Sequence, residues 1–420
     1  MTASLSRTLL EATVAATAEA LRFMQPADAL LSAFFRRTHA GPRERALIAE
    51  AAYAVLRKKR TLAAWAGSEE PRRLVLAALT RELGYSQRAL EGALLRHEAE
   101  WLAERKAQPE PLLSPAEASE LPDWLYERLA AHFPEEEFPR LMHALNRPAP
   151  LDLRVNVLKA ERETVRLQLT EAGIAASPCR YAPAGIRLRE KPALARHPLF
   201  LEGLIEVQDE GSQLIGHLVA PRRGEMIVDF CAGAGGKTLQ LGALMRSTGR
   251  LYAFDVSEKR LAKLKPRLAR SGLSNVHPVV IAHEHDARIK RLAGKCDRVL
   301  VDAPCSGLGT LRRNPDLKWR QTPASIAELT AKQAAILAAA ARLLKPGGRL
   351  VYATCSLLPE ENEAIVDAFL AAHASFARRN AGEILAMQGI AIEQEGEDLH
   401  LLPHVHDTDG FYAAVLERRS

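Results

Sequence analysis

The spacing of hydrophobic positions divides the chain of 420 residues into three parts. In residues 1–140 apolar side chains recur every three or four positions, as between Leu47 and Leu56, which predicts helices. Residues 141–205 combine short strand patterns with one helical pattern and predict a small α+β module. In residues 206–420 strands alternate with helices, which is typical of a parallel sheet covered by helices. We therefore expect an all-α domain, a small α+β module and an α/β domain.

Apolar, β-branched runs define the strands of the α/β part, and one long periodic run, Leu329 to Leu344, predicts a helix between the last two parallel strands. The expected strands are Met226–Asp229, Leu251–Phe254, Val276–Ile281, Arg298–Val301, Arg349–Ala353 and, at the end of the chain, Phe411–Leu416. Residues 105–123 are rich in Pro, Glu and Ser, which predicts a linker after the helical domain.

Composition places the chain among ordinary globular proteins, with 47% hydrophobic and 26% charged residues. The longest apolar run, Ala334 to Ala341, is too short to span a bilayer, and we expect no signal peptide, no membrane association and a cytoplasmic location. The five cysteines include no CxxC pair, so neither a disulfide framework nor a zinc site is expected.

The net charge of +6 suits a polyanionic partner but does not by itself identify one. Basic residues gather at two expected helix ends, at Arg36–Arg37 and at Arg57–Arg60. Cations at a helix C-terminus complement the helix dipole, whereas repeated clusters in one domain could also contact RNA phosphates. Both interpretations stay open at this point.

A glycine-rich turn follows the first expected strand of the α/β part and opens a helix. Its glycines, Gly233, Gly235 and Gly236, allow the backbone to approach a ligand closely. Asp255 lies about 20 residues further on, at the end of the next strand, where a carboxylate can accept ribose hydroxyls. Too few residues precede Lys237 for a Walker phosphate loop. The pattern predicts a nucleoside-containing cofactor, either S-adenosylmethionine or a dinucleotide.

Two cysteines close two strand-like runs further along the chain. Cys305 follows Asp302 in one run, and Cys355 ends the other. A single such cysteine would be interpreted as a small buried hydrophobe. Two thiols beside a cofactor turn instead favour covalent chemistry, such as methyl transfer to carbon 5 of a pyrimidine, which needs a thiolate on carbon 6.

Two further groups of residues are candidates for binding, one for RNA and one for a metal ion. The run Leu311–Arg320 is basic with one aromatic residue, so it could bind RNA phosphates and stack a base, or pack Trp319 inward. Histidines cluster with an acid at 283–286 and at 404–407, but without the spacing of a metal site. We expect RNA contact at the first group and no metal at the second.

Taken together, these motifs resemble the Nop/Sun family of RNA cytosine-5 methyltransferases over about the last 220 residues. The matching segments are Asp229–Thr238, Asp302–Gly307, Arg312–Trp319, Thr354–Ser356 and Asp409–Tyr412. The helical part, including Gly41–Arg45, looks like the NusB-type RNA-binding domain of the bacterial Sun branch. The resemblance implies a Rossmann-like class I methyltransferase domain, preceded by an RNA-recognition-like module, that methylates a cytosine of small-subunit ribosomal RNA.

The resemblance also implies a role for each site residue. Cys355 would attack carbon 6, Cys305 would assist release of the methylated base, and Asp302 would bind the cytosine edge close to the cofactor. Asp255 would bind the ribose of S-adenosylmethionine, and Asp286 would lie on the adenine side. The other expected cofactor contacts are Cys231, Ala232, Gly233, Ala234, Gly235, Gly236, Lys237 and Arg260.

The expected partner is ribosomal RNA, either naked or within a partly assembled small subunit, and the protein is expected to be a monomer. One alternative is a methyltransferase of another RNA such as tRNA, and another is a non-catalytic assembly factor that binds ribosomal RNA. A DNA cytosine-5 methyltransferase would use Pro304-Cys305 as its nucleophilic dipeptide, but this would leave Cys355 without a role.

Overall fold

The computed structural model describes residues 4–420, which form two compact units. The helical unit runs to Arg147 and also includes the later segment Thr310–Pro323. The α/β unit consists of Pro148–Gly309 and Ala324–Ser420. The sequence pattern grouped Thr310–Pro323 with the α/β part, whereas the segment packs with the N-terminal helices.

The helical unit encloses two apolar clusters, one around Leu62 and Leu74 and one around Phe34 and Ile48. Its helices are α1 (Arg7–Ala20), α2 (Ala27–Arg37), α3 (Pro42–Arg57), α4 (Lys59–Ala66), α5 (Pro71–Arg81), α6 (Gln87–Leu90), α7 (Arg96–Ala107), α8 (Pro115–Ser119), α9 (Asp123–Ala130), α10 (Phe138–Leu145) and α18 (Leu317–Arg320). The predicted linker 105–123 contains α8, because Ser114 and Glu117 form a capping box that starts a helix there.

A small antiparallel sheet begins the α/β unit. Its strands, in the order β2-β3-β1-β4, are β1 (Leu151–Val155), β2 (Ala176–Pro178), β3 (Gly185–Leu188) and β4 (Ile205–Val207). Helices α11 (Arg162–Glu171) and α12 (Pro198–Leu201) complete this module around Ile186 and Leu169. The predicted α+β module of short strands and a helix is confirmed, and its strands form a four-stranded antiparallel sheet.

The main sheet has eight strands, of which β5 to β9 are parallel. They are β5 (Met226–Asp229), β6 (Arg250–Asp255), β7 (Val276–Val280), β8 (Cys296–Asp302), β9 (Leu344–Thr354), β10 (Phe376–Arg379), β11 (Leu399–Leu401) and β12 (Phe411–Arg418). Their order is β10-β12-β9-β8-β5-β6-β7, with β11 paired to β12. The order reverses between β5 and β8, and such a switch point is where doubly wound sheets bind ligands.

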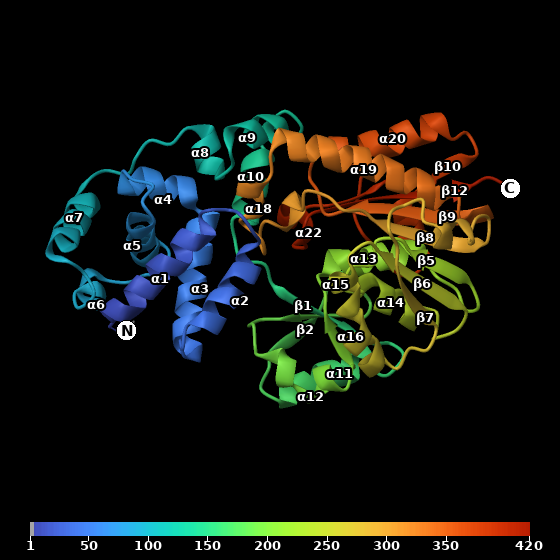
Figure 1. The fold of residues 1–420 in the computed structure, drawn as a ribbon, viewed down its shortest axis with the longest axis horizontal. Helices are drawn as coiled ribbons and strands as arrows, with labels where there is room; N and C mark the ends of the chain where they lie inside the picture. The colour runs from blue at the N-terminus through green and yellow to red at the C-terminus, as the bar shows by residue number, and fades with distance from the viewer. Residues whose placement is uncertain (1–3) are drawn as a thin grey trace. The chain divides into compact units, whose positions relative to one another are not determined.

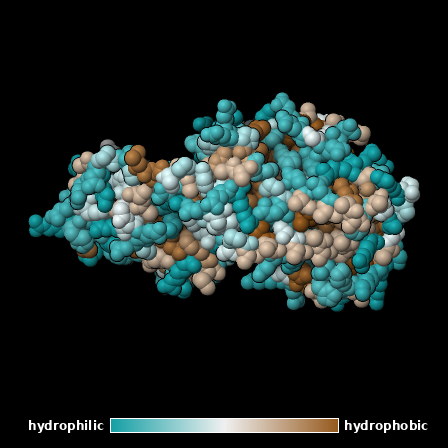
Figure 2. All heavy atoms as spheres, turned by 90° about the horizontal axis from the view of Figure 1, so that it is seen from above, coloured by the Kyte–Doolittle hydropathy of each residue, from teal (hydrophilic) through white to brown (hydrophobic). Residues whose placement is uncertain are grey.

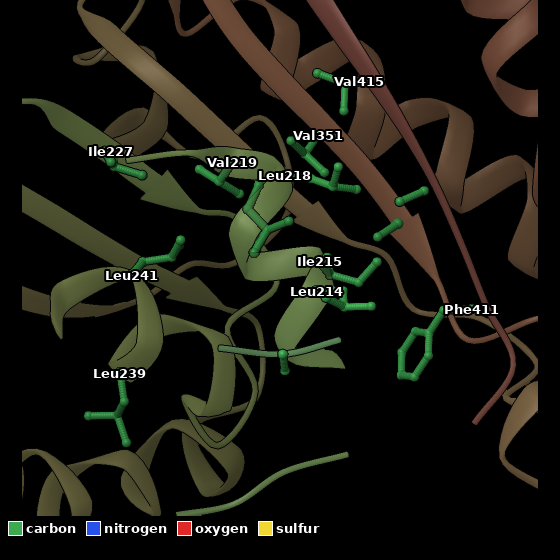
Figure 3. Close-up of a cluster of buried hydrophobic side chains, with 14 of the residues drawn as sticks. Leu214, Ile215, Leu218, Val219, Ile227, Leu239, Leu241, Val351, Phe411 and Val415 are labelled. Carbon is green, nitrogen blue, oxygen red and sulfur yellow. The ribbon is translucent and has the colours of Figure 1, made fainter. Parts of the chain in front are cut away.

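Helices cover both faces of this sheet because successive strand residues point to opposite sides. On β8, Leu300 packs into the cluster that contains α13, whereas Val299 and Val301 pack with Ile336 of α19. Figure 1 shows α19 and α20 on one side of the sheet and α13, α14 and α16 on the other. Figure 3 shows Leu214 and Leu218 of α13 lying against Val351 and Phe411 of the sheet. The helices are α13 (Glu210–Val219), α14 (Gly236–Leu244), α15 (Glu258–Ala262), α16 (Leu264–Ser271), α17 (Ala287–Lys290), α19 (Pro323–Ala341), α20 (Glu363–Ala372), α21 (Ala381–Ala386) and α22 (Pro403–His406).

One predicted boundary differs from the structure. The helix expected to end at Leu344 ends at Ala341, and Leu344 already begins β9. The register of β9 against β8 shifts after the pair Cys296–Leu344, so Lys345–Gly348 forms an irregular section within the strand.

Hydrophilic residues cover much of the face drawn in Figure 2, with hydrophobic ones interspersed. Among residues 4–420, none of the helices combines the length and apolar character that a membrane span requires.

Candidate active site

The carboxyl ends of four parallel strands place the predicted site residues at one edge of the main sheet. Strand β6 ends at Asp255, β8 ends at Asp302, and Cys355 directly follows β9. These residues line a cavity of about 380 Å³ together with Cys231 and Cys305. Five predicted site residues that follow or end separate strands thus lie together at one cavity.

The two thiols face each other across this cavity. The Cys305 Sγ and Cys355 Sγ atoms are 3.4 Å apart, and the backbone N–H of Cys355 donates to Cys305 Sγ over the same distance. The hydrogen bond to Cys355, reinforced by burial, raises the pKa of the Cys305 thiol well above its ordinary value. The two thiols are therefore a close pair at the cavity, brought together from the ends of β8 and β9.

A buried lysine pairs with the carboxylate that precedes Cys305. Lys237 Nζ, at the start of α14, lies 2.8 Å from Asp302 Oδ2. Burial lowers the pKa of Lys237, but the neighbouring Asp302 carboxylate outweighs that effect and the net shift is upward. Lys237 thus remains a cation that fixes Asp302 at the cavity.

The second carboxylate, Asp255, holds the glycine-rich turn. Asp255 Oδ2 accepts the backbone N–H of Gly233 at 2.7 Å, and Oδ1 accepts that of Ser257 at 2.7 Å. Arg260 Nη1 lies 3.8 Å from the same carboxylate. Gly233 has φ +57°, and an added Cβ would lie 2.8 Å from the Arg260 guanidinium, so glycine suits both the conformation and the space.

Most of the remaining turn residues support the site from behind. Ala232 N–H donates to the Phe254 carbonyl, Ala234 accepts from Arg267, and Gly236 accepts from Arg154. Gly235 has φ +83°, and a Cβ there would lie 2.2 Å from the side chain of Leu264. Of the predicted turn residues Cys231 to Lys237, Cys231 is the one that lines the cavity.

Two acids of the loop between β7 and α17 are placed differently. Asp286 caps α17, and its carboxylate accepts the backbone N–H groups of Ala282 and Arg288, which lowers its pKa. Asp286 is not among the residues that line the cavity, whereas Glu284 is. Sequence reasoning did not select Glu284, because an acid in a loop of mixed charge carries no signal of its own.

The sequence pattern did not identify two further residues that line the cavity. Lys332 and Ile336 reach the cavity from α19, where the helical period identified Ile336 only as a core position. Burial raises the pKa of Asp229, at the end of β5, to about 7, and Thr238 donates to this carboxyl group at 2.6 Å.

The basic run after Cys305 buries its lysine and part of its tryptophan. Lys318 is 1% exposed and donates to the Arg57 carbonyl at the end of α3 and to Asn146. Trp319 Nε1 donates to the Leu56 carbonyl at 3.0 Å. The expectation of RNA contact is therefore wrong for Lys318, which together with Trp319 attaches the segment to the helices, and it stays a prediction for the rest of the run.

The first histidine cluster lies in the loop before α17, whereas His404 and His406 belong to the short helix α22. The rings of His283 and His285 are 6.2 Å apart, and His406 accepts the N–H of Leu402. Within the described residues, one group has metal-like spacing, namely Asp152, Cys179 and Glu210. Arg187 already pairs with both acids of that group, so it needs no ion.

A Rossmann-like sheet with a glycine turn, strand-end acids and paired thiols at its switch point defines a class I, S-adenosylmethionine-dependent methyltransferase. The family model described as "16S rRNA methyltransferase RsmB/F" matches residues 216–417, and the "Methyltr_RsmF/B-like, ferredoxin-like domain" matches residues 121–195. The chain is 40% identical over 307 residues to the "Probable ribosomal RNA small subunit methyltransferase B" of Synechocystis sp., with 73% of this chain and 68% of that protein covered. The chain therefore belongs to the RsmB/F methyltransferase family. Because the methyltransferase match lies largely within the α/β unit, this unit is called the catalytic unit from here on.

Solved structures agree with this assignment. The crystal structure of PH0851 is 27% identical and superposes over 100% of both chains with a TM-score of 0.81. The structure of NSun6 from Pyrococcus horikoshii contains SFG, an analogue of S-adenosylmethionine. It superposes over 71% of this chain and 98% of the NSun6 chain, with a TM-score of 0.63. At 23% identity, the latter supports the fold alone.

Proposed function

We propose that this protein transfers a methyl group from S-adenosylmethionine to carbon 5 of a cytosine in small-subunit ribosomal RNA, through a covalent bond between Cys355 and carbon 6. The observation that carries the proposal is the 3.4 Å separation of the Cys305 and Cys355 sulfur atoms in the cavity beside Asp302. The Synechocystis relative, named for ribosomal RNA of the small subunit, supports the choice of RNA.

The cavity residues fit a nucleoside-containing cofactor. Each Asp255 oxygen accepts one backbone N–H and keeps a further lone pair, so the carboxylate can also accept ribose hydroxyls. Phe230 and Ile281 give the same cavity apolar walls. The turn from Cys231 to Lys237, with Arg260, would hold the remainder, and Asp286 stays a proposed contact on the adenine side. When bound, S-adenosylmethionine supplies an activated methyl group.

The thiols provide the covalent chemistry. The thiolate of Cys355 adds to carbon 6 of the base, which places electron density on carbon 5 and makes that carbon a nucleophile. Once carbon 5 carries the methyl group, loss of its proton restores the double bond and breaks the sulfur–carbon bond. Cys305 lies beside the attacking sulfur and assists this last step.

Asp302 supplies the choice of base. A carboxylate accepts hydrogen bonds from the exocyclic amino group of cytosine, whereas uracil presents a carbonyl oxygen at that position. Lys237 occupies one Asp302 oxygen, Oδ2, and orients the group. We therefore propose Asp302 as the residue that favours cytosine over uracil.

The helical unit is proposed to be a NusB-like domain that positions RNA, in a cytoplasmic monomer. The exposed basic residues on its surface include Arg36, Arg37, Arg43 and Arg45. Arg37 already pairs with Glu19 at 2.8 Å, so phosphate contact at that position would compete with this ion pair.

The proposal is tested by incubating the full chain with methyl-labelled S-adenosylmethionine and either small-subunit ribosomal RNA or tRNA, followed by bisulfite sequencing. We expect 5-methylcytosine in the ribosomal RNA, and none with Cys355→Ala. Label in tRNA alone would contradict the choice of substrate. Absence of cofactor binding in a calorimetric titration would instead favour the assembly-factor alternative.

A further inference from the structure

One buried carboxylate connects the two cysteine loops. Ser306 and Ser356 directly follow Cys305 and Cys355, and both hydroxyls donate to Glu361 Oε2, that of Ser306 at 2.5 Å. The backbone N–H of Ser306 donates to Glu361 Oε1 at 2.8 Å. Because each serine is adjacent to a cysteine, Glu361 fixes both loops from a single point.

Glu361 is itself held both at its side chain and at its backbone. Gln333 of α19 donates to Glu361 Oε1 at 3.0 Å and to the Pro304 carbonyl at 2.9 Å. The Tyr352 hydroxyl of β9 donates to the Glu361 carbonyl at 2.6 Å. The carboxylate therefore has little freedom to follow a movement of either cysteine loop.

The charge at this position is unusual for a core. Glu361 is 0% exposed, and none of the ion pairs formed by the described residues involves it. Its oxygens accept four hydrogen bonds instead, from Ser306, Ser356 and Gln333. A buried carboxylate without a cation is costly, so packing alone does not account for it.

We propose that Glu361 is a positioning residue that holds the Cys305 and Cys355 sulfur atoms at the separation needed to release the methylated base. This inference rests on the proposed covalent mechanism but concerns a residue that does not touch the base. The negative charge also acts on the thiols, because Glu361 contributes to the raised pKa of Cys305. At a fixed separation, Cys305 can act on the intermediate that Cys355 forms without itself leaving the pair.

Two substitutions separate the effect of the Glu361 charge from the effect of its side-chain length. Glu361→Gln keeps the length of the side chain, but its amide NH₂ replaces one acceptor oxygen that faces the serine hydroxyls. Glu361→Asp keeps the charge but is one methylene shorter, so it cannot reach both loops. Glu363→Gln is the matched control, because Glu363 starts α20 two residues away and lies near His400 rather than the thiols.

The first measurement needs no catalysis. Diamide oxidises two close thiols to a disulfide by taking one hydrogen atom from each, and peptide mapping by mass spectrometry identifies the Cys305–Cys355 product. We expect a rate at least ten-fold lower in both Glu361 variants than in the wild type and the control. Wild-type rates in folded Glu361 variants would overturn the proposal.

The second measurement follows turnover with RNA. We expect Glu361→Gln to lower kcat at least ten-fold, leave KM for S-adenosylmethionine unchanged and accumulate the covalent protein–RNA adduct. Unchanged kcat would overturn the positioning role. If no protein, wild type included, methylated RNA, the proposed function would fail while the diamide rates still decided the role of Glu361. Should Glu361→Gln not fold, the double variant Ser306→Ala/Ser356→Ala removes the same two hydroxyl contacts and is held to the same outcomes.

Discussion

The segments before and after Gly309 both bury polar side chains, but these side chains have different kinds of partner. Before it, the loop after β8 carries Cys305 and Ser306, whose partners are a second thiol and the buried Glu361 carboxylate. After it, the segment Thr310–Pro323 inserts Lys318 into the helical unit, where its partners are the Arg57 carbonyl and Asn146.

The two segments differ in whether reactive atoms remain accessible at a cavity. Around the thiols, fixed donors leave two sulfur atoms free to face a cavity. The Lys318 ammonium group instead donates to the Arg57 carbonyl at the C-terminal end of α3, where a positive charge complements the helix dipole. A basic cluster next to a catalytic residue in sequence is therefore not, by that fact, part of a binding surface.

The sharpest way to break the catalytic side of this comparison is to remove each thiol separately. Cys355→Ala should lose methylation completely and form no adduct, since carbon 5 is then never activated. Cys305→Ala should form the bond to carbon 6 but fail to resolve it. Denaturing electrophoresis with labelled RNA should show a retained adduct in Cys305→Ala alone. The Pro-Cys alternative demands the reverse, with the adduct lost on changing Cys305.

The structural side is tested through the titration of Lys318. Burial lowers its pKa from 10.5 to about 7, although the Glu120 charge partly opposes the shift. Between these pH values the unfolded chain binds more protons than the folded one, so stability should rise with pH. The gain is at most about 1.4 kcal/mol per pH unit. Lys318→Met should remove this part of the slope.

Tryptophan fluorescence is a suitable probe for that experiment. All four tryptophans, Trp65, Trp101, Trp124 and Trp319, belong to the helical unit, so their signal follows its unfolding rather than that of the catalytic unit. Urea unfolding of the full chain at pH 7, 8.5 and 10 would give the slope. Parallel curves for the wild type and Lys318→Met would show that Lys318 is not buried as a titrating group.

A smaller effect is expected at the cofactor side of the catalytic unit. Asp255→Ala removes the proposed ribose acceptor and the support of Gly233. Hydrogen bonds to a charged group contribute roughly 1.5–3 kcal/mol, which corresponds to a ten- to hundred-fold loss of affinity for S-adenosylmethionine. Calorimetric titration measures this directly, with Asp286→Ala as the comparison. An unchanged dissociation constant in folded Asp255→Ala would exclude the ribose role.

The sequence predicted most of the catalytic unit because its signals are local. Buried parallel strands are continuous apolar runs, and each ends at a residue such as Asp255 or Asp302 that the sheet then aligns. Glu361 and Glu284 carried no such signal, because their roles depend on residues distant in the chain. Lys318 was misinterpreted for the same reason. Its burial follows from Arg57 and Asn146, more than 170 positions earlier.

This arrangement also changes how the helical unit can be tested. Deleting the first 140 residues would strip Lys318 and Trp319 of their partners Arg57 and Leu56. A loss of function in such a deletion would then combine RNA binding with exposure of the segment after Cys305. Point substitutions on the surface of the helices avoid this difficulty.

The smallest expected effect concerns the basic residues that do remain on the surface. Arg57 to Arg60 are engaged within the helical unit, for example Arg60 with Asp123 at 2.6 Å, whereas Arg36 and Arg45 are exposed beside a second cavity of about 380 Å³. If the helical unit contacts phosphates, the double variant Arg36→Gln/Arg45→Gln should weaken RNA binding a few-fold. Each lost phosphate contact should also reduce the slope of log affinity against log salt by about 0.7 for single-stranded RNA.

The control for that experiment is Arg96→Gln on α7, because Arg96 is 95% exposed and pairs only with Glu100 in the same helix. It removes a positive charge from the same unit, so a general effect of net charge would appear in it as well. Filter binding over a range of salt concentrations would give both affinity and slope. An equal change in Arg96→Gln, scaled for one charge rather than two, would mean that no defined phosphate contact lies at Arg36 and Arg45. A change confined to the double variant would locate the RNA on the α2–α3 surface, away from the basic segment that the sequence had favoured.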